Sequence, residues 1–307
     1  MTNISLMGGL GNQLFQLAFG LHLSPDEGFT LKPILANTRR DFSGRPDICS
    51  LQLPGRVAID DGPEVERWLI SRLIGRGLRL STSKSSKLLV RFIEALLFLF
   101  SQDSLARVRF ADGIGSEISH FDSKGGLYVG YFQSCHFAQH PRVLDELMSM
   151  APLRPSQLLN RTIQEVQEKK PILLHVRLTD YLAPGSFGIP NVDYYRTSIS
   201  EIGADVTTQE LWVFSDAPSQ ALDFLPEEFL GRYRLAPLLD EAVQNFELMR
   251  HFSGYIIANS SFSWWAAQLR RDRSARVLCP WPWFKQELHQ KGDFIPNEWV
   301  TVASHLK

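Results

Sequence analysis

SQLLNRTIQEVQEKKPILLHV, residues 156–176, places a helix pattern directly before an apolar strand pattern. Apolar side chains recur at helical spacing from Leu159 to Val166, and Pro171 ends the pattern because proline cannot continue a helix. The short apolar run that follows is typical of a strand buried in a parallel sheet. The stretch therefore predicts a helix and a buried strand, the repeating unit of an α/β fold.

The same alternation continues toward the C-terminus. Three further apolar runs are typical of strands: ELWVFSD (210–216), YIIAN (255–259) and VLCPW (277–281). The second of them leads into the helix pattern FSWWAAQLR, for which Ser260 or Ser261 is a suitable cap. Strands that alternate with helices predict a parallel, doubly wound sheet.

The N-terminal half opens in the same way. ISLM (4–7) predicts a strand, GGLGN a turn, and QLFQLAFGLHL an apolar helix. The two prolines of APLRPS (151–156) mark the best boundary between the halves. We therefore expect an α/β protein of two domains, residues 1–154 and residues 155–307, with a cleft between them.

Composition excludes several classes of protein. The 307 residues are 44% hydrophobic and 21% charged, which excludes global disorder and a membrane bundle. The formal net charge is −1, from 32 basic and 33 acidic residues, so no global attraction to nucleic acid exists. Three scattered cysteines without a CxxC pair provide neither a disulfide framework nor a zinc site, and they favour a cytoplasmic compartment.

One basic stretch of the sequence has two interpretations. Seven basic residues and no acidic residue lie from Arg67 to Arg91. They lead into the apolar run at 88–100, which is well short of the roughly 20 residues that span a bilayer. The stretch is either a solvated face beside a buried helix, or a peripheral contact of residues 67–100 with an anionic membrane at its inner, cytoplasmic face.

The N-terminal residues also lack the pattern of a signal peptide.

Polar clusters follow the predicted strands, where open α/β sheets bind ligands. The clusters are Gly8–Gln13, His175–Tyr181, Ser215–Asp216 and Asn259–Trp265. The first is neither a dinucleotide fingerprint nor a P-loop. Gly9 and Gly11 would allow a ligand close to the turn, and Asn12 and Gln13 would offer it amide groups; a purely structural turn is the equal alternative.

The second cluster points to phosphate chemistry. His175 and Arg177 are two residues apart at a strand end, so their side chains point to the same side. Arg177 provides a fork of donors that suits two phosphate oxygens, and His175 can donate or accept a hydrogen bond. Asp180 would fix Arg177 or accept a proton. The structural alternative is a buried histidine beside an ordinary salt bridge.

The serine-rich cluster predicts a second anion site. Ser260 and Ser261 open a helix, whose first-turn amides attract negative charge. No Asp-x-Asp, HExxH or GxSxG occurs in the sequence, which argues against a metal-bridged diphosphate, a zinc protease and a serine hydrolase. Phosphate bound by arginine and helix amides, without a metal, is the chemistry that remains.

These residues resemble glycosyltransferase family 11, the α-1,2-fucosyltransferases in their bacterial form. The resemblance covers nearly the whole chain, in the order of the family. The matching stretches are GGLGNQLFQLA (8–18), GYFQS (130–134), HVRLTDY (175–181), DYYRTSI (193–199), FSD (214–216), NSSFSWWAA (259–267) and VLCPWPWF (277–284).

The resemblance implies a GT-B-like fold, with two Rossmann-like domains that face a central cleft. Residues 1–154 would be the acceptor side, and residues 155–307 would bind the nucleotide sugar. The implied activity is an inverting transfer, without metal or cofactor, of L-fucose from GDP-β-L-fucose to a galactoside hydroxyl in α-1,2 linkage. The acceptor would be an oligosaccharide or a lipid-linked glycan in surface glycan or O-antigen synthesis.

The resemblance also implies roles for single residues. Arg177 would bind the β-phosphate and stabilise the leaving GDP, and His175 would contact the donor nucleotide. Asn12 would face the fucose and the acceptor hydroxyl. Both His175 and Asp180 are candidates for the general base. The remaining donor-binding residues would be Asp216, Asn259, Ser260, Ser261 and Phe262.

Two departures from the family pattern leave the donor sugar open. The family usually reads Arg-Arg-Gly-Asp where this chain has Arg177-Leu178-Thr179-Asp180, and two aspartates after FS where it has Asp216-Ala217. Another deoxysugar nucleotide on the same fold is the first alternative. The second is a non-catalytic protein that binds a nucleotide sugar or a glycan.

Overall fold

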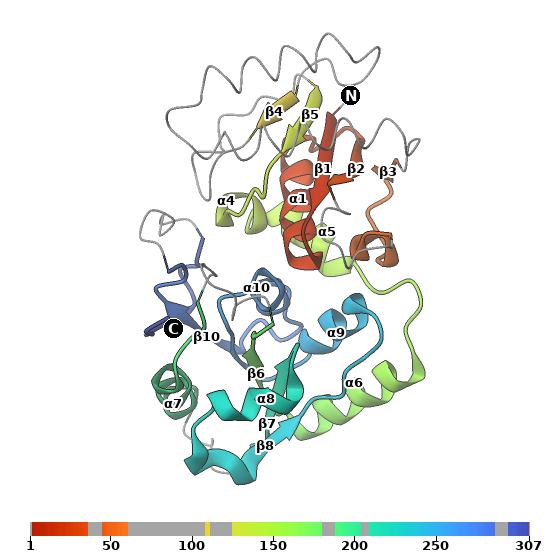
Figure 1. Cartoon of the computed structure of the whole chain (residues 1–307). Coiled ribbons are helices and arrows are strands. Elements are labelled where there is room, and N and C mark those ends of the chain that lie inside the picture. The colour runs from red at the N-terminus through yellow and green to blue at the C-terminus, as the bar shows by residue number, and fades with distance from the viewer. Residues whose placement is uncertain are drawn as a thin grey trace. The chain divides into compact units, whose positions relative to one another are not determined.

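The chain forms two compact α/β units in a computed structural model (Figure 1). Unit 1 comprises Met1–Leu153 and Gly292–Phe294, and unit 2 comprises Arg154–Lys291 and Ile295–Lys307. Each unit is described by itself. The structure describes residues 2–35, 45–60, 108–110, 125–179, 188–203, 209–285 and 294–306.

Unit 1 is built on a five-stranded sheet in the order β3-β2-β1-β5-β4, and its named strands pair in parallel. The strands are β1 (Thr2–Met7), β2 (Phe29–Leu35), β3 (Val57–Ile59), β4 (Val108–Phe110) and β5 (Gly126–Val129). The helices are α1 (Leu10–Leu23), the 3-10 helix η1 (Asp47–Ser50), α4 (Cys135–Ala138) and α5 (Pro141–Ser149). The strand, turn and helix expected at the N-terminus are therefore confirmed as β1, the turn at Gly8 and Gly9, and α1.

A buried glutamine joins the helix of unit 1 to its sheet. Gln16 lies on α1 and is fully buried. Its side-chain oxygen accepts a hydrogen bond from the Met7 N–H at 3.0 Å, and its Nε2 donates to the Met7 C=O at 3.3 Å and to the Gly130 C=O at 3.2 Å. One amide thus satisfies backbone groups at the ends of the neighbouring strands β1 and β5, and it fixes the turn between β1 and α1.

Unit 2 is built on a six-stranded sheet in the order β11-β10-β9-β6-β7-β8, again with parallel pairing between its named strands. The strands are β6 (Ile172–Val176), β7 (Leu211–Ser215), β8 (Tyr233–Leu235), β9 (Gly254–Ile256), β10 (Arg276–Trp281) and β11 (Val300–Ala303). The α-helices are α6 (Gln157–Lys169), α7 (Val192–Glu201), α8 (Pro218–Ala221), α9 (Ala242–Met249) and α10 (Ser261–Gln268). The described part of the unit also contains the 3-10 helices η4 (Leu222–Phe224) and η5 (Glu227–Arg232).

The helix and strand expected from residues 156–176 are confirmed as α6 and β6. Ser156 caps α6 by accepting a hydrogen bond from the Leu159 N–H at 3.1 Å, and the left-handed backbone of Lys170 ends the helix before Pro171. The strand expected at 255–259 is shorter, because it ends in a tight turn. In that turn the Ser260 N–H donates to the Ala258 C=O at 2.8 Å and leads the chain into α10.

The two faces of the unit 2 sheet separate the side chains of β6. The even-numbered side chains, through Val176 to Leu178, lie in a hydrophobic core cluster together with buried tyrosines of α7. Strand alternation therefore places His175 and Arg177 together on the opposite face, as the sequence predicts. The residues that matter for chemistry are held by a strand whose other face is packed into the core.

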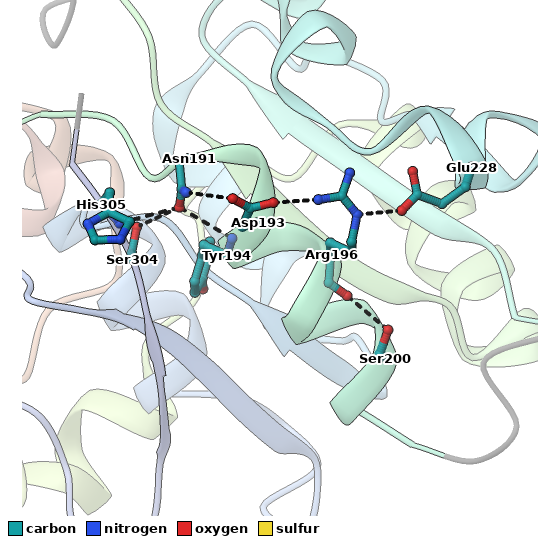
Figure 2. A network of polar contacts seen from close by, with 8 residues as sticks. All are labelled: Asn191, Asp193, Tyr194, Arg196, Ser200, Glu228, Ser304 and His305. Carbon is teal, nitrogen blue, oxygen red and sulfur yellow. Dashed lines mark hydrogen bonds and ion pairs between the residues drawn. The ribbon is translucent and has the colours of Figure 1, made fainter.

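The C-terminal tail is tied to the N-terminal end of α7 (Figure 2). The Asn191 side-chain oxygen accepts hydrogen bonds from the Tyr194 N–H at 3.3 Å, the Ser304 hydroxyl at 3.5 Å and the His305 N–H at 3.3 Å. Asn191 is thus both the cap of α7 and the anchor of the residues after β11.

The division into units differs from residues 1–154 and 155–307 in two respects. Arg154 belongs to unit 2, which moves the boundary by one residue. Gly292–Phe294 belongs to unit 1, where the ring of Phe294 lies 5.8 Å from that of Phe15 between centroids. The stretch 67–100, for which membrane contact is one reading, lies outside the described residues. Of the helices that the structure does describe, none is long and apolar enough to cross a membrane.

Replacement of Gln16 with leucine should destabilise unit 1. The change leaves one backbone N–H and two backbone carbonyls of this buried region without their partner, so we expect the free energy of unfolding to fall by about 3 kcal/mol. Urea unfolding measures this change in the free energy of unfolding. Gln164→Leu, on the exposed surface of α6, is the control. An equal effect of both variants would contradict the role of Gln16.

Candidate active site

An arginine and an aspartate meet at the ends of two neighbouring strands of unit 2. Val176 of β6 pairs with Ser215 of β7, which brings the next residues, Arg177 and Asp216, side by side. Arg177 Nε lies 3.2 Å from Asp216 Oδ2, with the two side chains 30% and 17% exposed. The paired strands thus hold a cation at the carboxyl edge of the sheet, where α/β proteins bind ligands.

The Asp216 carboxylate also binds the backbone that follows β6. Its Oδ1 accepts a hydrogen bond from the Leu178 N–H at 2.9 Å, and its Oδ2 accepts one from the Thr179 N–H at 3.1 Å and one from the Thr179 hydroxyl. Burial by itself would raise the pKa of Asp216, but the hydrogen bonds from Thr179 and Leu178 and the charge of Arg177 lower this pKa below its ordinary value. Asp216 is therefore charged at neutral pH.

Leu178 follows Arg177 directly and is one of the positions at which the sequence departs from the expected family pattern. Its side chain is fully buried in the hydrophobic core cluster, against which Ala217 also packs. Position 178 is thus a core position in this chain, because strand alternation turns it away from the face of Arg177. Leu178 and Ala217, one residue from each departure, thus face one core.

His175 is buried on the face of Arg177. Burial, together with the nearby charge of Arg177, lowers the pKa of His175 to about 3. Its Nδ1 is buried and has no hydrogen-bond partner among the described residues. The imidazole is therefore neutral at physiological pH, and its low basicity argues against His175 as the general base.

The start of α10 is a capped helix N-terminus. Ser260 is the cap, and its side-chain oxygen accepts a hydrogen bond from the Phe262 N–H at 3.3 Å. Ser261 and Phe262 are half-buried in the first turn. The end of β9, which leads into this cap, is next to β6 in the sheet. Unit 2 thus brings Arg177 and the positive end of a helix to the same edge.

Asn259 is turned into the protein. Its Nδ2 donates to the Gly188 C=O at 3.0 Å and to the Trp283 C=O at 3.2 Å, and the residue is 3% exposed. These bonds join the segments before α7 and after β10. In this structure Asn259 thus holds these two segments together at the edge of the sheet.

The two polar side chains beside the glycine turn of unit 1, Asn12 and Gln13, differ in burial and in hydrogen bonding. Asn12 is half-buried, and its Oδ1 accepts a hydrogen bond from Gln133 Nε2 at 2.9 Å. Gln13 is buried, and both ends of its side-chain amide are bonded within the protein. Its oxygen accepts a hydrogen bond from the Ile48 N–H at 2.9 Å, and its Nε2 donates to the Gly8 C=O at 2.9 Å. The expectation that Gln13 offers its amide to a ligand is therefore not met, since the fold uses that amide.

The glycines of the turn also differ. Gly8 has φ +72°, a conformation that favours glycine, and a Cβ on it would approach Asn12 Nδ2 to 2.5 Å. A Cβ on Gly9 would meet nothing within 4 Å, so Gly9 faces open space. Gly11 is buried in the first turn of α1. Of the three, Gly9 best allows close approach of a ligand.

The sequence did not predict two polar contacts, one in each unit. In unit 1, Gln133 donates to Asn12 and was present only within the matched stretch GYFQS. In unit 2, Thr179 donates to Asp216 and was named only as a departure from the family pattern. The residue before Gln133, Phe132, has φ +51° and stacks on Phe19 at 3.9 Å between centroids. Asp180, the other candidate base, lies outside the described residues and stays a prediction.

The fold and this edge define a class of protein. A parallel α/β unit that presents an arginine, a supporting carboxylate and a capped helix N-terminus is suited to an anionic ligand such as a nucleotide. The family follows from the sequence: residues 118–303, more than half of the chain, match the model of Glycosyl transferase family 11, and the chain belongs to that family.

Two curated relatives from Escherichia coli are similar to this chain. An alpha-1,2-colitosyltransferase is 26% identical over 305 residues, which covers 97% of each chain. The O-antigen biosynthesis glycosyltransferase WbnK is 29% identical over 136 residues, which covers 42% of this chain and 43% of WbnK.

Two solved structures are similar at low identity. Fucosyltransferase NodZ from Bradyrhizobium has a TM-score of 0.45 and 13% identity, over 86% of this chain and 92% of NodZ. The E. coli ADP-heptose LPS heptosyltransferase II has a TM-score of 0.48 and 11% identity, over 98% of this chain and 90% of the enzyme.

We expect the imidazole of His175 to stay neutral in the folded protein at physiological pH. As the pH falls below about 6.5, the unfolded chain protonates this histidine and the folded chain does not, so stability should fall by about 2 kcal/mol between pH 6.5 and 5 from this residue. NMR titration of the ring checks the pKa, with His175→Gln to assign its signal. A titration midpoint between pH 5.5 and 7.5 would refute the expectation.

Proposed function

We propose that this chain is an inverting, metal-independent α-1,2-fucosyltransferase, which moves L-fucose from GDP-β-L-fucose to a galactoside hydroxyl of a glycan. Membership of the glycosyltransferase family supports the reaction class. The observation that carries the assignment to a nucleoside diphosphate donor is Arg177, held at the carboxyl edge of the unit 2 sheet by Asp216. A cation at this position suits a leaving diphosphate.

The reaction joins the acceptor oxygen to the anomeric carbon of the sugar and breaks the bond from that carbon to the β-phosphate oxygen. The acceptor proton goes to a general base, and the electron pair of the broken bond leaves with GDP. Negative charge therefore grows on the diphosphate in the transition state. Arg177 and the N-terminal amides of α10 are the groups that we assign to this charge.

We assign the acceptor side to the glycine turn of unit 1. Asn12 and Gln133 form a pair of side-chain amides that is half-buried, so both are within reach of a ligand. Amides both donate and accept hydrogen bonds, as recognition of sugar hydroxyls requires. Gln13 is left out of this set because its amide is used by the fold.

A second donor is favoured by one comparison. The relative that matches over 97% of this chain is an alpha-1,2-colitosyltransferase, and colitose, like fucose, is a deoxysugar. The buried Leu178, which leaves Arg177 as the arginine of this loop, fits an altered donor as well. Transfer of colitose to a glycan hydroxyl is therefore our second candidate.

A panel of donors separates the candidates. Purified protein is incubated with GDP-fucose, GDP-colitose and dTDP-rhamnose, and with galactose-terminated glycans, free and lipid-linked. We expect turnover of GDP-fucose with an α-1,2 product, and equal rates within about twofold in EDTA. Turnover of GDP-colitose alone would favour the second candidate. Turnover of dTDP-rhamnose alone, or loss of activity in EDTA, would overturn the proposal.

Arg177→Ala should lower kcat/KM for transfer by about 10³-fold, because a preorganised cation at the leaving group is lost. Arg177→Lys should recover part of this rate, since it restores charge without the planar fork. Thermal unfolding controls for the fold. Transfer by the alanine variant at the wild-type rate would rule out the leaving-group role of Arg177.

A further inference from the structure

We propose that Asp216 and Thr179 act as positioning residues, which together aim the guanidinium of Arg177 at the diphosphate and do not themselves bind the donor. We call these two residues, with the Leu178 N–H, the Asp216 brace. The inference rests on the proposed function, because it assigns Arg177 to the diphosphate of a nucleotide sugar.

The first argument is that most of the acceptor capacity of Asp216 is used within the protein. A carboxylate has about four acceptor sites, two on each oxygen. Oδ2 contacts the Thr179 N–H, the Thr179 hydroxyl and Arg177 Nε, and Oδ1 accepts the Leu178 N–H. Oδ2 is therefore fully used, and one acceptor site on Oδ1 is all that is left for the donors of a guanine or a ribose. This differs from the expectation that Asp216 holds the guanosine diphosphate itself.

The second argument is electrostatic. A charged carboxylate repels a diphosphate, so direct contact between the two would weaken binding. In this structure the carboxylate instead faces a guanidinium and three hydrogen-bond donors of one short segment. Its negative charge is compensated by the groups around it, and its useful effect on a diphosphate passes through Arg177.

The third argument is that the segment around Arg177 is fixed from both sides. The Leu178 side chain is fully buried in the core cluster, while its N–H donates to Asp216 on the other side. Arg177 lies between this anchored residue and the buried Val176 of β6. Asp216 contacts Nε, the nitrogen nearest the arginine stem, and this sets the plane in which the terminal nitrogens lie.

Thr179 offers the mildest test of the brace, because it is exposed and lies outside the core. Thr179→Val keeps the shape of the side chain but removes the hydroxyl that donates to Asp216, whereas Thr179→Ser keeps the hydroxyl. Asp216→Asn removes the charge and places an amide donor either where three donors now meet Oδ2 or where one donor meets Oδ1. These variants are matched in size, and they change the brace without changing Arg177.

The experiment measures affinity for GDP and for GMP by titration calorimetry, in wild-type protein and in the Arg177→Ala background. We expect Thr179→Val to weaken GDP binding about fivefold and Asp216→Asn about tenfold, while Thr179→Ser stays within about twofold. GMP lacks the β-phosphate, so its affinity should not change. In the Arg177→Ala background the brace variants should have less than about a twofold effect on GDP.

The outcomes separate this inference from the proposed function. Equal weakening of GDP and GMP, or the same loss with and without Arg177, would overturn the brace and indicate a merely structural role. Loss of GDP affinity in Arg177→Ala, with Thr179→Val like wild type, would overturn the brace but keep the proposed function. No GDP binding by wild-type protein would overturn both. Should Asp216→Asn fail to fold, the Thr179 pair decides.

Discussion

The carboxyl edge of the unit 2 sheet is organised around one carboxylate that receives two successive backbone N–H groups. Two adjacent amides at the end of a strand are a ready site for an anion, and in unit 2 the anion is Asp216 of the neighbouring strand. These amides therefore already hold an anion of the protein itself. Among the described residues, the Arg177 side chain and the first turn of α10 are further positive groups at this edge, and Arg177 is held by the same carboxylate. Strand pairing between β6 and β7 thus sets this arrangement, because it brings residues 177 and 216 together.

Each unit uses different polar side chains to hold its backbone. In each, a polar side chain binds the backbone at the end of a strand. Unit 2 uses the charged Asp216, beside an arginine whose charge it balances. Unit 1 uses neutral amides: Gln16 joins the ends of β1 and β5, and Gln13 joins the glycine turn to η1. Neutral anchors suit a side that we assign to sugar hydroxyls, since a fixed charge there would need its own partner.

Much of the fold and part of the site could be predicted from the sequence. The helix and strand within 156–176 were readable because apolar spacing is local, and so was the common face of His175 and Arg177. What was not readable depends on contacts between distant segments. That Asp216 contacts Arg177 follows from the pairing of β6 with β7, which brings together Leu178 and Asp216, 38 residues apart in the chain. The inward turn of Gln13 follows from the position of η1, and the neutrality of His175 from its burial, which the sequence pattern does not give.

The return of Phe294 to unit 1 changes how the chain can be divided. Because Gly292–Phe294 belongs to unit 1 while residues on both sides belong to unit 2, the backbone passes between the units three times. Each unit is therefore formed by two separate segments of the chain, and the units are not consecutive domains joined by a single linker. A proteolytic cut near residue 154 would leave two further covalent links between them. A fragment that began there would carry an aromatic ring whose partner, Phe15, lies in the other piece.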